Sequence, residues 1–125
     1  MTYDNSAIVA AFCREFDVPA PDPTKLGGYF TEDAIYHNIP MAPVSGRAAI
    51  EAVLGGMASS MLSSGWEVKH QVATGDVVMN ERIDRFKVGE KTVAIPVVGV
   101  FELRDGKIAA WRDYFDLAMW QKQMA

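Results

Sequence analysis

Two short segments of the chain combine charged and apolar residues at a spacing that could move protons. Side chains alternate along a strand, so in the segment NERIDRF the Arg82 guanidinium and the Asp84 carboxylate share one face. In IAAWRDYF, Asp113 shares its face with Trp111 and Phe115, which predicts a carboxylate that faces the interior. Two buried carboxylates resist simultaneous ionisation, but an arginine between them lets one accept a proton while the other donates one. We therefore interpret Arg82, Asp84 and Asp113 as an acid–base group.

The same segments also allow simpler interpretations. An arginine two residues before an aspartate on a strand is typical of a structural salt bridge at a sheet surface, and both faces of VVMNERIDRF are mixed in polarity. Tyr36 and Asn38 in AIYHNI share a face, where a hydroxyl and an amide could hold a water molecule. Such a pair also occurs on exposed strands, so the residues alone leave both interpretations open.

Helices come first in the predicted order of elements, and hairpin-connected strands follow. Apolar residues recur at helical spacing over residues 5–17 and again from Ser45 to Met61, although Gly55 and Gly56 interrupt the second run. Between these helices, residues 18–28 indicate an irregular connection or a broken helix. The pattern predicts a short final helix over residues 117–124 and strands over residues 34–39, 66–73, 76–88, 91–103 and 106–115. This order indicates an α+β domain whose bent antiparallel sheet is covered on one face and encloses a pocket.

Composition narrows the classes of function. The chain has 125 residues, enough for one domain with a buried core, and its 12 Lys and Arg against 16 Asp and Glu give a net charge of -4. That balance argues against nucleic acid or an anionic membrane as a partner. No apolar run approaches the ~20 residues of a membrane-spanning helix, and the first residues lack the features of a signal peptide. The one cysteine, Cys13, lies on an apolar helix face, so we expect it in the core of a cytoplasmic protein.

The sequence does not indicate a metal or cofactor site. His37 and His70 have no second ligand at metal-site spacing, and a single cysteine cannot build a thiolate-rich site. The chain also has no glycine-rich phosphate loop and no nucleophile elbow. We expect neither a metal nor an organic cofactor.

Three segments taken together resemble the limonene-1,2-epoxide hydrolase family: YFTEDAIYHNIPMAPVSGR, NERID and VGVFELRDGKIAAWRDYFDL. The resemblance runs from about Ile8 to Trp120, and its specificity lies in Y-x-N, R-x-D and W-R-D occurring in that order. It implies a cone-shaped α+β domain of the nuclear transport factor 2-like class over residues 1–125. In that class a strongly curved, mixed or antiparallel sheet carries N-terminal helices on one face and a short C-terminal helix. It also implies a homodimer.

The resemblance implies a role for each of five polar residues. Asp113 is the general base that deprotonates a water, Tyr36 and Asn38 also hold that water, Asp84 protonates the epoxide oxygen, and Arg82 orients both carboxylates. The implied reaction adds water to a small apolar, terpene-like or cyclic epoxide and gives a vicinal diol in one concerted step without a cofactor. A positioned acid and a positioned base each contribute about 10²- to 10⁴-fold to such a reaction.

Seven apolar residues line the substrate pocket by the same resemblance, although their chemistry equally fits an ordinary core: Met57, Met61, Phe86, Ile95, Val97, Phe115 and Trp120. Two other functions compete on this fold. One is proton transfer of the ketosteroid isomerase or polyketide cyclase type, with one aspartate as base and Tyr36 polarising a carbonyl. The other is a non-catalytic domain that binds a small molecule, because fold alone does not determine function.

Overall fold

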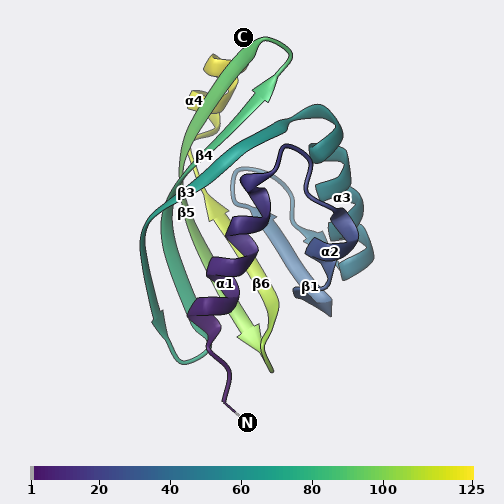
Figure 1. The fold of residues 1–125 in the computed structure, drawn as a ribbon, viewed down its shortest axis with the longest axis vertical. Helices are drawn as coiled ribbons and strands as arrows, with labels where there is room; N and C mark the ends of the chain where they lie inside the picture. The colour runs from purple at the N-terminus through teal and green to yellow at the C-terminus, as the bar shows by residue number, and fades with distance from the viewer. Residues whose placement is uncertain (1) are drawn as a thin grey trace.

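One curved sheet with helices on its concave side forms the molecule, as the computed structural model of residues 2–125 shows (Figure 1). The sheet has six strands in the order β2-β1-β6-β5-β4-β3. The helical elements are α1 (Asn5–Arg14), the short 3-10 turn η1 (Glu15–Asp17), α2 (Pro23–Gly27), α3 (Arg47–Ser60) and α4 (Leu117–Met124). The strands are β1 (Phe30–Asn38), β2 (Val44–Ser45), β3 (Leu62–Thr74), β4 (Val77–Val88), β5 (Lys91–Arg104) and β6 (Lys107–Tyr114). This architecture confirms the predicted α+β class and its curved sheet.

The sheet is mixed rather than wholly antiparallel. Strand β1 pairs with β6 in parallel, whereas every other pair of neighbouring strands is antiparallel. Parallel strands need a long crossover connection, and here α3 and the strands β2 to β5 lie between them in the chain. The register of this pair places Tyr36 beside Trp111 and Asn38 beside Asp113. The β1–β6 pairing therefore brings two distant parts of the sequence together at one level of the sheet.

The first helix supplies much of the main core. Asp4 caps α1, because its Oδ1 accepts a hydrogen bond of 3.0 Å from the Ala7 amide. The ring of Phe12 is fully buried and meets Trp111 edge-on, with 5.1 Å between the ring centres. Cys13 is also buried, as its helix position predicted. The predicted helix over residues 5–17 was slightly too long, since its last turn tightens into η1.

Helix α3 forms despite its two glycines because it is anchored by packing. Gly46 precedes it with a φ of 95°, a left-handed conformation that favours glycine. The Arg47 side chain donates to the Phe30 carbonyl at 2.6 and 3.1 Å, which ties the start of the helix to β1. Ile50 and Leu54 are buried in the core. Gly55 allows close contact with α2, because a Cβ there would lie 3.3 Å from Pro23.

Strands β1 and β3 begin earlier than predicted, at residues 30 and 62 instead of 34 and 66. The serine- and glycine-rich stretch before residue 66 is part of β3, where the register shifts between Ser63 and Gly65. Gly65 has a φ of 107°, so a residue that indicated a turn occupies a bulge within the strand. Such bulges bend strands and help to curve the sheet.

Helix α4 lies at the end of the sheet opposite the N-terminus (Figure 1). The Gln123 side chain forms hydrogen bonds of 2.8 and 2.9 Å with both main-chain groups of Ala94 on β5. Trp120 packs against a second, smaller apolar cluster on the same strand. Within residues 2–125, none of the helices combines the length and apolar character that crossing a membrane requires.

Candidate active site

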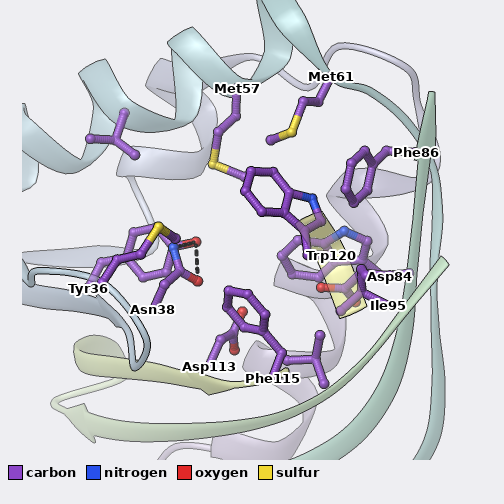
Figure 2. Close-up of a pocket in the computed structure, with 14 residues that line it drawn as sticks. Tyr36, Asn38, Met57, Met61, Asp84, Phe86, Ile95, Asp113, Phe115 and Trp120 are labelled. Atoms are coloured by element: carbon purple, nitrogen blue, oxygen red, sulfur yellow. Dashed lines mark hydrogen bonds between the residues drawn. The ribbon is translucent and has the colours of Figure 1, made fainter. Parts of the chain in front are cut away.

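A cavity of about 280 Å³ lies between α3, the concave face of the sheet and α4. Figure 2 shows Met57 of α3 and Met61, which directly follows that helix, reaching into the cavity opposite Asp113 and Phe115. All seven apolar residues that were predicted to line a pocket lie on its wall: Met57, Met61, Phe86, Ile95, Val97, Phe115 and Trp120. Four of the predicted polar residues also line it, namely Tyr36, Asn38, Asp84 and Asp113. Its wall includes Met41, Val53 and Trp66, which the sequence analysis did not single out.

Arg82 lies behind the cavity wall and joins the two aspartates. Its Nε and Nη2 donate to the two carboxylate oxygens of Asp84, each at 2.9 Å. Its Nη2 and Nη1 donate to Asp113 at 2.8 and 3.3 Å. Arg82 is 0% exposed, Asp84 8% and Asp113 4%. The alternative of a salt bridge on the sheet surface is therefore wrong, because all three charged groups face the interior.

A glycine on β5 makes this contact across the sheet possible. Arg82 is on β4 and Asp113 on β6, so the guanidinium must pass over the strand between them. At that level β5 carries Gly99, which is paired with Asn80 on one side and Asp113 on the other. A Cβ at Gly99 would overlap Arg82 Nη1. Gly99 was not predicted from the sequence to have this role, although a glycine inside a strand is a known sign of close approach by another group.

Two tryptophans complete the surroundings of the charged group. The Trp111 indole donates from Nε1 to Asp113 Oδ1 at 2.7 Å, and Trp111 also stacks on the Tyr36 ring with 3.9 Å between centres. The Arg82 guanidinium carbon lies 4.4 Å from the ring centre of Trp66, a cation–π contact. From the sequence, Trp111 was predicted only to be an aromatic neighbour of Asp113. Trp111 lies two residues before Asp113 on the same face of the strand, and this spacing indicates that its N–H can reach that carboxylate.

Burial and charge pull the proton affinities of these groups in different directions. Burial raises the pKa of Asp84 above its ordinary value, Arg82 opposes that rise, and the nearby charge of Asp113 adds to it. Burial lowers the pKa of Arg82, but Asp113 and Asp84 together hold it well above the usual range. Burial also raises the pKa of Cys13 to about 11, so this cysteine stays a neutral thiol at neutral pH. Among the groups of the site, Asp84 is thus biased towards its protonated form.

Tyr36 and Asn38 lie side by side on β1. The Tyr36 hydroxyl is 3.2 Å from Asn38 Oδ1, and Asn38 Nδ2 donates to the hydroxyl oxygen at 3.0 Å (Figure 2). Burial, with the nearby charge of Asp113, raises the pKa of Tyr36, so its hydroxyl remains a neutral donor. Because an amide has two N–H donors, Asn38 keeps one for a further partner in the cavity. The strand register places that amide next to Asp113.

Within residues 2–125, no group of three or more His, Cys, Asp or Glu side chains lies so that it could hold a metal ion. The positive charge beside the acidic pair of the site comes from Arg82, which donates to both carboxylates.

The curved sheet with its helices is the nuclear transport factor 2-like fold, which solved structures of several proteins share. An LEH-like epoxide hydrolase of Mycobacterium tuberculosis superposes with a TM-score of 0.83 at 28% identity, covering 95% of this chain and 87% of the other. A hypothetical protein of Catenulispora acidiphila with a ketosteroid isomerase-like fold, in complex with trimethylamine, gives a TM-score of 0.82 at 21% identity. The match covers 93% of this chain and 90% of that protein. A putative polyketide cyclase of Xanthomonas campestris gives a TM-score of 0.80 at 21% identity, covering 97% of this chain and 96% of the cyclase. The last two similarities show the fold alone.

Within this class, the chain belongs to the limonene-1,2-epoxide hydrolase family. The family model of the limonene-1,2-epoxide hydrolase catalytic domain matches residues 7–125. Epoxide hydrolase EphG of Mycobacterium tuberculosis is 38% identical over 88 residues, which make up 69% of this chain and 57% of EphG. The match thus spans little more than half of that relative. Family membership confirms the resemblance recognised in the sequence.

Proposed function

We propose that the chain is an epoxide hydrolase that adds water to a small apolar epoxide and releases a vicinal diol. The observation that carries the proposal is the fully buried Arg82, which forms two-pronged ion pairs with two carboxylates on the wall of one apolar cavity. Membership of the limonene-1,2-epoxide hydrolase family supports the same activity. We infer that residues 1–125 act as one domain.

The five polar residues divide the reaction between a base side and an acid side. Asp113 takes a proton from a water that Tyr36 and Asn38 hold beside it. The water oxygen forms a bond to one epoxide carbon as the C–O bond on the far side of that same carbon breaks, and Asp84 gives its proton to the departing oxygen. The raised pKa of Asp84 supports this acid role, because it favours the protonated form before the reaction. Afterwards Asp113 carries a proton and Asp84 a charge, and proton exchange with solvent restores the starting state.

The position of acid and base on the wall of one cavity supports a one-step reaction. Both groups then act on a bound epoxide at the same time, and neither a covalent intermediate nor a cofactor is needed. Arg82 supports both roles, since it orients the carboxylate that accepts and the carboxyl that donates.

The cavity supports a compact apolar substrate. Its volume of about 280 Å³ lies just below the ~300–1,000 Å³ that is common for drug-sized ligands. Side chains on its wall are mainly apolar, with polar atoms concentrated at Tyr36, Asn38, Asp84 and Asp113. A terpene-like or cyclic epoxide would place its ring against the apolar wall and its oxygen beside Asp84. Met57 and Met61 would let the wall adapt to different rings.

Isomerase chemistry of the ketosteroid type fits this site less well. Proton removal next to a ketone uses one carboxylate base with neutral donors at the carbonyl oxygen. Here two carboxylates share one buried cation, because Arg82 donates to Asp113 at 2.8 Å and to Asp84 at 2.9 Å. A purely binding domain would gain nothing from a desolvated group of this kind, because burying three charges is costly.

Diol formation is the direct test. The protein is incubated with a panel that includes cyclohexene oxide and limonene oxide, and any diol is identified by chiral chromatography. We expect hydrolysis by the wild type, and its near loss in Asp84→Asn and Asp113→Asn with an unchanged circular dichroism spectrum. Asp33→Asn is the matched control, because Asp33 is an exposed aspartate paired with Arg104 on the surface. The absence of diol across the panel would refute the proposed function.

A homodimer is also part of the proposal, and the outer face of the sheet supports it. Several large apolar residues there are exposed: Ile35, Val72, Met79, Val98 and Tyr114. Val98 is paired with Tyr114, and Val72 with Met79. Light scattering should give twice the monomer mass for the wild type and the monomer mass for Val98→Glu. A monomeric wild type would contradict this assembly.

We further propose a cytoplasmic location, which rests on the single buried thiol. Cell fractionation with an antibody against the protein tests it, and recovery with the periplasmic or secreted fraction would exclude it.

A further inference from the structure

A chain of polar side chains connects Arg82 with the first helix. Asn80 lies two residues before Arg82 on β4 and is 2% exposed. Its Oδ1 accepts from Arg82 Nη1 at 3.1 Å, and its Nδ2 donates to Gln71 Oε1 at 3.3 Å and to Cys13 Sγ at 3.6 Å. Gln71 in turn donates from Nε2 to the Ser6 hydroxyl at 2.8 Å and to the Ser6 carbonyl at 2.9 Å. The contacts thus run without a break from α1 through β3 to the charged group.

The partners at both ends determine which way the two amides point. The Ser6 carbonyl can only accept, so Gln71 must turn its Nε2 towards α1 and its Oε1 towards Asn80. Asn80 must then present Nδ2 to Gln71 and Oδ1 to Arg82. Arg82 can only donate, which requires the same orientation from the other end. Asn80 therefore has a single orientation that satisfies every contact.

Asn80 takes the hydrogen-bond donor that the two aspartates leave over. Arginine has five N–H donors. Four of the contacts of Arg82 go to Asp84 and Asp113, and the remaining one goes from Nη1 to Asn80. Because Arg82 is fully buried, water cannot replace a lost partner. The contact from Nη1 to Asp113 is also the longest of the set, at 3.3 Å against 2.8 Å for Nη2.

We propose that Asn80 is a positioning residue that binds Arg82 Nη1 and so fixes the guanidinium in the orientation in which it meets both Asp113 and Asp84. The inference rests on the proposed function for its effect on catalysis. Asn80 itself does not line the cavity that Asp84 and Asp113 face, so it acts through Arg82. Without the Asn80 oxygen, one buried N–H of Nη1 has no partner, and the guanidinium is no longer held in place between Asp113 and Asp84.

Two replacements of the same shape separate positioning from packing. Asn80→Leu removes the acceptor, and we expect kcat to fall about tenfold with KM unchanged, since one hydrogen bond to a charged group contributes roughly that factor. Asn80→Asp keeps an acceptor oxygen. At acid pH, where the new carboxyl is protonated and neutral like the amide, it should retain kcat within about threefold of the wild type. As pH rises it ionises and competes for Arg82, so kcat should fall.

A nitrogen NMR spectrum of the arginine side chains tests the positioning without any substrate. In the wild type the Arg82 guanidinium protons should exchange slowly with water, because every N–H is bonded and buried. In Asn80→Leu the Nη1 signal should shift and its exchange should accelerate. Val78→Ala is the control, because Val78 is fully buried on the same face of β4 and is absent from the contacts of Arg82. It lowers stability without touching the polar chain.

The outcomes distinguish this inference from the proposed function. If the wild type hydrolyses epoxides and Asn80→Leu matches its kcat, the positioning role is refuted while the activity stands. If both replacements lose kcat equally at every pH and in step with thermal stability, Asn80 is merely structural. If the wild type forms no diol, the NMR result still decides whether Asn80 positions Arg82, and an unchanged Arg82 spectrum in Asn80→Leu overturns the inference.

Discussion

Replacing Arg82 with methionine would test the energetic role of the buried charge directly. Methionine keeps most of the side-chain volume and removes the guanidinium. Two carboxylates that are 8% and 4% exposed, those of Asp84 and Asp113, would then lose their cation. Breaking a buried ion pair by removing one partner usually costs about 3–5 kcal/mol, because the remaining charge is left desolvated. We expect a loss of that size in the free energy of unfolding of Arg82→Met at pH 7.

The loss should depend on pH in a defined direction. Burial already raises the folded-state pKa of Asp84 above its ordinary value of 3.8, so its contribution to stability is full below that value and is lost as pH rises through the raised pKa. Arg82 lowers this pKa, and its removal therefore extends the loss to higher pH. Each further unit by which the folded-state pKa of Asp84 rises costs about 1.4 kcal/mol of stability, at a pH above both its folded and its unfolded pKa values. The deficit of Arg82→Met should thus be larger at pH 7 than at pH 5.

Urea denaturation at pH 5 and pH 7, at one fixed protein concentration, measures both effects. The matched control is Arg85→Met on the same strand, because Arg85 also forms an ion pair of 2.8 Å, with Glu67, but both side chains are about half exposed. An exposed pair contributes about 0–1 kcal/mol, so this control should unfold close to the wild type. Equal losses in the two variants, or an Arg82→Met deficit that grows towards acid pH, would refute the reasoning.

Three further predictions concern neighbours of the charged group and the cavity wall. Gly99→Ala should cost about 1–3 kcal/mol of stability by urea denaturation and lower kcat, because the added methyl group overlaps Arg82 Nη1; unchanged kcat would contradict the close fit. Trp111→Phe should keep the stacking on Tyr36 but lower kcat about tenfold by removing the N–H bonded to Asp113; wild-type kinetics would show that this bond is dispensable. Trp120→Ala should raise KM about tenfold for cyclic epoxides with less effect on kcat, since it removes apolar wall rather than a polar group; a loss confined to kcat would exclude a role in binding.

The inward direction of Asp113 was predictable from its strand alone. Trp111 and Phe115 share its face, and rings of that size are rarely left in water on both sides of a carboxylate. The inward direction of Arg82 and Asp84 was not predictable, because both faces of their strand are mixed. In the structure, α1 packs on the face of β4 that carries Asn80 and Arg82, and Cys13 contacts Asn80. This packing turns Arg82 and Asp84 towards the interior.

The positions of the strands could be predicted from the sequence more readily than which strands pair with each other. The pattern located a strand that includes Tyr36 and Asn38, but nothing local says that it pairs in parallel with β6. That pairing depends on how the whole chain closes, and it sets the place of Asn38 beside Asp113. The role of Gly99 likewise becomes visible only when the guanidinium is known to pass over β5.

The central claim is that Asp113 activates a water molecule and does not itself attack the epoxide. A single turnover in water enriched in oxygen-18, with the protein in excess over cyclohexene oxide, tests it most directly. Direct attack by water predicts one heavy oxygen in the diol from the first turnover and none in the protein. A first-turnover diol with ordinary oxygen only, followed by label in the peptide that carries Asp113, would contradict the account, because it requires a covalent ester intermediate.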